Sequence, residues 1–223
     1  MNSETSFDDL VAAAEEEWLK GWTSGPTEPE GYGLPKGAPA PVLVLVDHNG
    51  DDRSLSEFWR DSPALVMFWR HFGCSCGVDR AKRLLDEYPA YQEAALVPLI
   101  VTQGEPARAA AYRDQHGLPF PLLSDPDLVA YRAFGVSQWA VERVLFDAPS
   151  EYWAHTTELG ADFQKRRRKE GRFLVDDPWR AAAEFVVGSD GLVGLCHMYQ
   201  HCEDFPDPRV LTTAARIARS VDH

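Results

Sequence analysis

The sequence lacks any apolar run long enough to cross a membrane, and it is short of positive charge. It has 22 lysine and arginine residues against 35 aspartate and glutamate residues, which gives a formal net charge of −13. A bilayer span needs roughly 20 consecutive apolar residues, and binding to nucleic acid or to an anionic membrane surface needs a basic face. We therefore expect neither nucleic acid nor a membrane among the partners of this chain.

Cysteine is also scarce, with four residues in a chain of 223. Two of the four lie one residue apart, and this number and spacing do not suit the disulfide framework of a secreted protein. Residues 1–18 are acidic and lack the basic-then-apolar pattern of a secretory signal. Glycine-rich phosphate loops, serine-nucleophile elbows and paired-carboxylate spacings are missing as well. These absences predict a cytoplasmic protein whose chemistry, if any, depends on cysteine.

The segment around which the chain is organised begins with six apolar residues, Ala64–Trp69, between Pro63 and Arg70. So short an apolar run is typical of a strand buried on both faces. A glycine-containing turn with Cys74 and Cys76 follows, and then a helical pattern of apolar residues. The two cysteines therefore lie where a central strand passes into a helix, the end of an open α/β sheet at which active sites collect.

A cysteine in the first turn of a helix faces unpaired backbone N–H groups and the positive end of the helix dipole, which lower its pKa. We expect Cys74 to be the attacking thiolate and Cys76 its neighbour or resolving partner. Arg70 and Arg80 are expected to stabilise the thiolate, and His71 to carry a proton. The alternative is a pair of buried, structural cysteines.

The rest of the chain alternates between helical and strand patterns. In order, we expect an amphipathic helix at 4–20, a Gly- and Pro-rich arm at 23–41, strand–helix alternation over 42–134, an irregular stretch at 137–180, a β-hairpin over 184–196 and a closing helix at 208–221. This predicts an N-terminal helix and linker arm at 1–35 and a single domain at 36–223, with an insertion at about 137–180. The basic run 165–169 is expected to face solvent or to pair with acidic residues rather than to bind an anion.

Three motifs carry a resemblance to a known family. They are Phe72-Gly73-Cys74-Ser75-Cys76 after the apolar strand, Leu122-Leu123-Ser124-Asp125-Pro126 before a helix, and Phe185-Val186-Val187-Gly188-Ser189-Asp190-Gly191 within the hairpin. Over residues 36–221 the chain resembles the peroxiredoxin-like (alkyl hydroperoxide reductase and thiol-specific antioxidant) family of the thioredoxin fold. The resemblance implies an α/β, thioredoxin-like three-layer sandwich, in which a mixed sheet carries helices on both faces.

The same resemblance implies a thiol–disulfide oxidoreductase with an antioxidant role and no cofactor. It implies a small dithiol protein or glutathione as reductant, and it leaves a homodimer open. Two departures from the family pattern stand out. Peroxiredoxins place a threonine three residues before the peroxidatic cysteine, whereas this chain has His71 or Gly73 there, counted from Cys74 or Cys76. The cysteines form Cys-x-Cys rather than Cys-x-x-Cys, and a disulfide between them would close a small, strained and therefore oxidising ring.

A second group of reactive residue types lies within Cys196–Asp204. If one antiparallel strand separates the last strand from the central one, the last strand ends at the same sheet edge as Cys74, at a distance of two strand spacings, or about 10 Å. Cys196 or Cys202 would then resolve a sulfenic acid or disulfide formed at Cys74 or Cys76.

Two alternatives remain open for this group. Four soft ligands suffice to bind zinc or an iron–sulfur cluster, and six candidates are present: Cys74, Cys76, Cys196, His197, His201 and Cys202. In the other alternative the histidines are hydrogen-bonded structural residues and the cysteines are inert. The chain would then be a non-catalytic, thioredoxin-like interaction module whose arm and insertion bind a partner or form a dimer.

Overall fold

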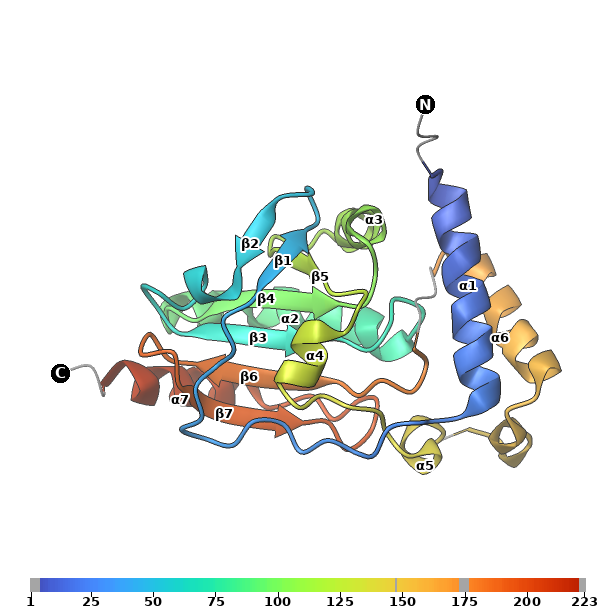
Figure 1. The fold of residues 1–223 in the computed structure, drawn as a ribbon. Helices are drawn as coiled ribbons and strands as arrows, with labels where there is room; N and C mark the ends of the chain where they lie inside the picture. The colour runs from blue at the N-terminus through green and yellow to red at the C-terminus, as the bar shows by residue number, and fades with distance from the viewer. Residues whose placement is uncertain (1–4, 147, 173–176, 221–223) are drawn as a thin grey trace.

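The computed structural model describes residues 5–146, 148–172 and 177–220, which build one mixed β-sheet with helices on both faces (Figure 1). Along the sheet the strands are β2 (Asp52–Ser54), β1 (Val44–Asp47), β5 (Leu122–Ser124), β4 (Val97–Thr102), β3 (Ala64–Phe68), β6 (Ala183–Val187) and β7 (Val193–Met198). The pairs β3–β4 and β4–β5 are parallel, and the other neighbouring pairs are antiparallel. The predicted mixed-sheet α/β sandwich is confirmed.

Strand β3 lies inside the sheet between β4 and β6, and all five of its residues are buried. Val66 and Phe68 belong to one apolar core and Leu65 and Met67 to the other. Successive side chains of a strand point to opposite faces, so a strand that contacts both cores must be apolar at every position. This explains the unbroken apolar run in the sequence.

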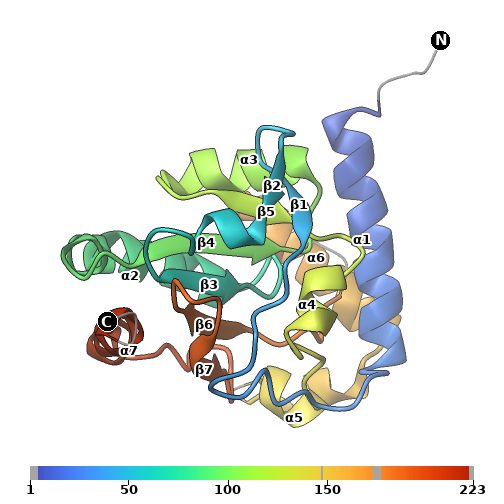
Figure 2. The ribbon, with the colours of Figure 1, turned by 60° about the vertical axis from the view of Figure 1, so that its left-hand side comes forward.

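Helices cover the two faces unequally. Helices α2 (Ser75–Glu93), α3 (Pro106–His116) and α7 (Pro208–Ser220) pack on the face of Leu65 and Met67. Helix α4 (Val129–Ala133) and the 3-10 turn η1 (Leu55–Glu57) pack on the opposite face. The three layers are visible in Figure 2.

Three residues, Pro89, Asp125 and Pro98, explain local details of the helices and strands. Helix α2 continues through Pro89 to Glu93. The Asp125 carboxylate accepts hydrogen bonds from the backbone N–H groups of Val129 and Ala130 at the start of α4 and so satisfies these donors. Pro98 pairs in register with Leu65, so β4 has no bulge at this position. The N–H of Ile100 points towards β5, and the backbone nitrogen two residues earlier, at Pro98, faces the same side. Pairing with β5 begins only at Ile100, so the lack of an N–H at Pro98 removes no hydrogen bond from the sheet.

Helix α1 (Phe7–Ser24) and helix α6 (Thr157–Lys169) lie side by side beyond the carboxyl ends of β3 and β4 (Figures 1 and 2). The short segments α5 (Val141–Val144) and η2 (Ser150–Ala154) lead into α6. Trp22 of α1 stacks on Trp18 and on Trp179, with ring centroids 5.4 and 5.3 Å away. A third apolar cluster therefore ties the start of the chain to residues of the insertion.

Within the described ranges, no helix has both the length and the apolar character that a membrane span requires.

Candidate active site

The site is built at the junction of β3 and α2. Cys74 is the N-cap residue of α2, and its backbone N–H donates to the carbonyl of His71 at 3.0 Å. Cys76 lies in the first turn of the same helix. The two cysteines are joined by a disulfide, with their Cα atoms 5.3 Å apart, and each is only 6% exposed. The positive end of α2 favours negative charge on either sulfur once the bond is reduced.

The sulfur of Cys202, which follows the β6–β7 hairpin in the sequence, also lies at this junction. Phe68 at the end of β3 pairs with Ala183 of β6, and Ala183 pairs with Met198 at the end of β7. Strand β7 therefore runs parallel to β3 and ends at the same sheet edge, as predicted. Cys202 follows in the next loop, and the sulfur atoms of Cys74, Cys76 and Cys202 all lie within 4.8 Å of one another.

Arg70 supplies the positive charge of the site. Its Nη1 lies 3.4 Å from the sulfur of Cys74 and 3.1 Å from that of Cys202. The side chain is 5% exposed, and its other nitrogens donate to the backbone carbonyls of Pro178 and Arg180. Among the described residues no carboxylate forms an ion pair with Arg70. A buried cation without a carboxylate partner favours negative charge on the sulfur of Cys74 once the disulfide is reduced.

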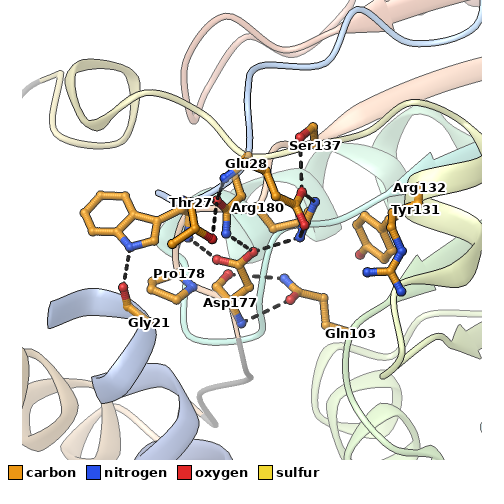
Figure 3. A network of polar contacts seen from close by, with 12 residues as sticks. Gly21, Thr27, Glu28, Gln103, Tyr131, Arg132, Ser137, Asp177, Pro178 and Arg180 are labelled. Carbon is orange, nitrogen blue, oxygen red and sulfur yellow. Dashed lines mark hydrogen bonds and ion pairs between the residues drawn. The ribbon is translucent and has the colours of Figure 1, made fainter. Parts of the chain in front are cut away.

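A polar network fixes the segment that holds Arg70 (Figure 3). The guanidinium of Arg180, 1% exposed, pairs with Glu28 at 2.6 Å and with Asp177 at 3.0 Å. Gln103 accepts from the backbone N–H of Asp177 at 3.1 Å and donates to the carbonyl of Arg70. Arg180 lowers the pKa of the Glu28 carboxyl, so both partners are charged. The N-terminal arm, the insertion and the active-site segment are therefore joined by one set of bonds.

His71 borders the same site but is not a cation. Burial, together with the charges of Arg70 and Arg167, holds the pKa of the His71 imidazole well below its usual value. Its Nδ1 is buried and has no hydrogen-bond partner among the described residues. A neutral imidazole accepts a proton only weakly at neutral pH, so the ring is better suited to hydrogen bonding than to carrying charge.

Arg80 was expected to stabilise a thiolate, but its guanidinium forms ion pairs with two carboxylates. Its guanidinium is 2% exposed and pairs with Glu184 at 2.7 Å and with Glu87 at 2.7 Å. Tyr199 donates a further hydrogen bond to Glu184. These carboxylates balance the charge of Arg80 locally, whereas the contacts of the described residues place Arg70 beside the sulfurs of Cys74 and Cys202.

The other residues of the second group do not join the three sulfurs. The sulfur of Cys196 lies 3.9 Å from the carbonyl of Tyr32, beneath the N-terminal arm, and burial raises the pKa of its thiol to about 11. His197 Nε2 lies 2.7 Å from the carbonyl oxygen of Asp204. The ring of His201 stacks on Phe146 with centroids 5.6 Å apart.

The positions of the six candidate ligands argue against the alternative of a metal site. Of the six candidate ligands, only Cys74, Cys76 and Cys202 form a close group within the described part of the chain. Two of these three sulfurs are bonded to each other, whereas zinc and iron–sulfur clusters bind cysteine as thiolate and take four ligands. The donor set therefore does not fit a metal centre, and the arrangement favours disulfide chemistry.

A cavity of about 370 Å³, the Cys74 cavity, opens onto this group. Cys74 and Cys202 line it with Arg70, while Cys76 does not. Its remaining lining comes from the β3–α2 junction, α1, the insertion and the loop after β7: His71, Ser75, Trp18, Trp22, Arg143, Val144, Leu145, Phe146, Ala148, Phe163, Arg167, Pro178, His201 and Glu203.

Sequence patterns did not assign Trp18, Trp22 or Arg167 to the site. Two signals were available: the tryptophans lie four residues apart on one helix face, and Arg167 belongs to the basic run. Within that run Arg168 pairs with Glu15 as expected, but Arg167 lines the cavity. Neighbouring positions of one helix point in different directions, and the sequence does not show which of them faces the sulfurs.

Comparison with known proteins identifies the family of the chain. The AhpC/TSA family model matches residues 36–166. A Mycobacterium tuberculosis protein named as a peroxiredoxin is 32% identical over 108 residues, which cover 47% of this chain and 68% of that protein. The Arabidopsis thaliana thioredoxin-like protein AAED1 is 26% identical over 105 residues, covering 46% and 42% of the two chains.

Solved structures show the same fold. Peroxidoxin BcpB from Mycobacterium tuberculosis superposes with a TM-score of 0.58 at 16% identity, covering 84% of this chain and 98% of the other. The thiol peroxidase from Chromobacterium violaceum gives a TM-score of 0.54 at 18% identity, covering 87% and 91%. Members of this family work through cysteine sulfur and need no bound cofactor. The chain belongs to the AhpC/TSA family, as a peroxiredoxin-like thiol oxidoreductase with a thioredoxin fold.

Proposed function

We propose that Cys74 is the attacking thiolate of a thiol–disulfide oxidoreductase and that Cys76 is its disulfide partner. The observation that carries this proposal is the contact between Arg70 and the sulfur of Cys74 at the start of α2. The guanidinium and the helix terminus act together, since both favour negative charge on the same atom. Cys74 also lines the Cys74 cavity, whereas Cys76 does not, so a small substrate reaches Cys74 first.

The cycle conserves atoms and electrons. The thiolate of Cys74 attacks one sulfur of a substrate disulfide, forms a mixed disulfide and releases the other sulfur as a thiolate. The thiolate of Cys76 then attacks Cys74 and releases the second substrate thiol, which leaves the Cys74–Cys76 disulfide. With a hydroperoxide, attack by Cys74 gives a sulfenic acid and an alcohol, and Cys76 displaces water from the sulfenic acid. A thiol reductant then supplies two electrons and restores both cysteines.

Cys202 is the second resolving thiol of this proposal. Its sulfur lies close to both members of the disulfide and shares the guanidinium of Arg70. Attack by Cys202 on the sulfur of Cys74 would exchange one protein disulfide for another and release Cys76. Cys196 takes no part, because its thiol lies under the N-terminal arm with a raised pKa.

The N-terminal arm of residues 1–35 and the insertion at about 137–180 serve in this proposal to enclose the site. His71 is a positioning residue at the cavity wall, and Arg80 orders the residues behind the cysteines through Glu184. The reductant is a small dithiol protein or glutathione.

Alkylation of the fully reduced protein with iodoacetamide, over a range of pH and with peptide mass spectrometry, tests the proposal. We expect Cys74 to react first, with a midpoint below the usual thiol value of about 8.5. Cys74→Ser should abolish single-turnover reduction of a small aromatic disulfide, while Cys196→Ser leaves it intact. Fastest labelling at Cys196, or unchanged turnover in Cys74→Ser, would overturn the assignment.

A further inference from the structure

The Cys74 cavity has features that a disulfide alone does not explain. Its volume of about 370 Å³ is at the small end of ligand-binding pockets, which measure roughly 300–1,000 Å³. Trp18 and Trp22 of α1 and Phe163 of α6 form an aromatic wall around it. These are the two helices that lie beyond the carboxyl ends of β3 and β4 (Figure 2).

The wall of the cavity carries positive charge that is incompletely neutralised. Among the residues that the structure describes, Arg167 forms an ion pair with one carboxylate, that of Glu170 at 3.7 Å. Burial and the nearby arginines outweigh that neighbour and lower the pKa of the Arg167 guanidinium. Arg143 contributes less, because Glu30 balances it at 2.7 Å. Glu203, which is the one carboxylate in the lining formed by the described residues, is exposed. A cationic cavity in a chain of net charge −13 calls for an anionic ligand.

Two polar atoms beside this charge have no partner. The indole Nε1 of Trp18 is buried in a side chain that is 4% exposed, and it makes no hydrogen bond among the described residues. The buried Nδ1 of His71 is likewise unpartnered within that part of the chain, and the two rings lie 6.5 Å apart, edge to face. An unsatisfied buried donor costs about 1–3 kcal/mol. An oxygen-bearing ligand in the cavity would remove that penalty.

The redox state of the site indicates which ligand this is. The cavity opens onto Cys74 while Cys74 is bonded to Cys76. The molecule that reacts with a disulfide is a thiolate, and therefore the reductant. Cys74 is 6% exposed and reached through a cavity walled by α1 and α6, which admits a small molecule more readily than the dithiol of a folded protein.

We propose that the physiological reductant is a low-molecular-weight thiol that bears a carboxylate, bound in the Cys74 cavity with its carboxylate at Arg167 and the indole N–H of Trp18. This rests on the proposed function and names the reductant class for the same site. The thiolate attacks the sulfur of Cys74 and forms a mixed disulfide, and Cys76 leaves as a thiolate. A second thiolate attacks the sulfur of the bound thiol, releases its disulfide and leaves Cys74 as a thiolate beside Arg70. Two small thiols are oxidised and one protein disulfide is reduced.

The test compares three probes on the oxidised full-length chain: 3-mercaptopropionate, neutral 2-mercaptoethanol and cationic cysteamine. Rates of Cys74–Cys76 reduction are measured by quenched alkylation and divided by the thiolate concentration. We expect the anionic thiol to react on the order of tenfold faster than the neutral one, as one charge-assisted contact allows. Arg167→Gln should reduce the ratio of the 3-mercaptopropionate rate to the 2-mercaptoethanol rate to about one. Arg168→Gln is the matched control, since Arg168 is the next residue and pairs with Glu15.

Equal rates for the three probes would overturn the proposal. So would equal losses in Arg167→Gln and Arg168→Gln, or reduction by a thioredoxin that outpaces 3-mercaptopropionate at equal concentration. Dithiothreitol separates this inference from the proposed function. If dithiothreitol reduces the Cys74–Cys76 bond but no charge preference exists, only the reductant class is wrong. If the bond fails to form or to be reduced at all, the proposed function itself is wrong.

Discussion

The Nη1 atom of Arg70 lies 3.4 Å from the sulfur of Cys74, and backbone carbonyls rather than carboxylates complete its hydrogen bonding. An exposed ion pair contributes little because water screens it. The guanidinium of Arg70 is 5% exposed, so its effect on a neighbouring thiol is only weakly screened. The neutral carbonyl ligands hold the guanidinium in place and leave its charge available to sulfur.

The first prediction follows from this contact. Arg70→Met should raise the pKa of the Cys74 thiol in the reduced protein, because the buried positive charge beside the sulfur is lost. Alkylation of Cys74 near neutral pH should slow on the order of tenfold. Arg83→Met is the matched control on α2, because the side chain of Arg83 is 48% exposed and pairs with Glu87. If both variants shift the Cys74 midpoint equally, the effect is general electrostatics and not the Arg70 contact.

The second prediction concerns the resolving thiol. With Cys76→Ser, mild oxidation should link Cys74 to Cys202, because their sulfurs lie within 4.8 Å of each other. Non-reducing peptide mapping would detect the crosslinked pair. Adding Cys196→Ser should leave its yield unchanged, while adding Cys202→Ser should replace it with sulfinic acid at Cys74. A Cys74–Cys196 crosslink would contradict the assignment.

The sequence was sufficient to predict which segments meet at the active site. The apolar run before Cys74 and the Gly188–Gly191 turn of the hairpin indicate a central strand and an antiparallel return. Strand polarity then places the end of β7 at the edge of the sheet near Cys74. The choice between Cys196 and Cys202 was not accessible, because it depends on the residue at which β7 ends. Cys196 lies within the strand and contacts the arm, and Cys202 follows it.

Contacts between residues far apart in the sequence explain the remaining differences between the predictions and the structure. Arg80 and Arg70 both flank the cysteines in the sequence, but Glu184, more than a hundred residues away, balances Arg80. Glu87, on the same helix, is a partner of Arg80 that lies near it in the sequence, but the sequence gives no sign of the pairing with Glu184. The cavity was equally inaccessible, because it exists only where α1 packs beside α6.

The third prediction concerns acid stability. The pKa of His71 is lowered in the folded protein, so below the usual value of about 6.5 the unfolded chain binds a proton that the native protein does not. The free energy of unfolding should therefore fall as the pH decreases from about 6.5, by up to about 1.4 kcal/mol per pH unit until the native pKa is reached. Urea unfolding of the wild type and of His71→Gln at several pH values measures this. The variant should show a shallower decline; parallel curves would exclude His71 as the cause.

The fourth prediction tests whether the polar network ties the N-terminal arm to the site. Glu28→Gln removes one of two acidic partners of the buried Arg180 guanidinium and leaves Asp177 at 3.0 Å. Losing a partner of a fully buried charge costs about 3–5 kcal/mol, but Glu28 is 33% exposed, so we expect a loss of about 1–2 kcal/mol in the free energy of unfolding.

The control for this variant is Glu17→Gln on α1, whose ion pair with Lys20 is more than half exposed on both sides. It should cost less than about 1 kcal/mol. Because Glu28 stabilises the segment whose carbonyls hold Arg70, Glu28→Gln should also slow the alkylation of Cys74, while Glu17→Gln should not. Equal unfolding free energies for the two variants would show that Arg180 is adequately neutralised by Asp177. An unchanged rate of Cys74 alkylation in Glu28→Gln would show that the bond between the arm and Arg180 does not affect the active site. The network would then stabilise the fold without influencing the reactive sulfur.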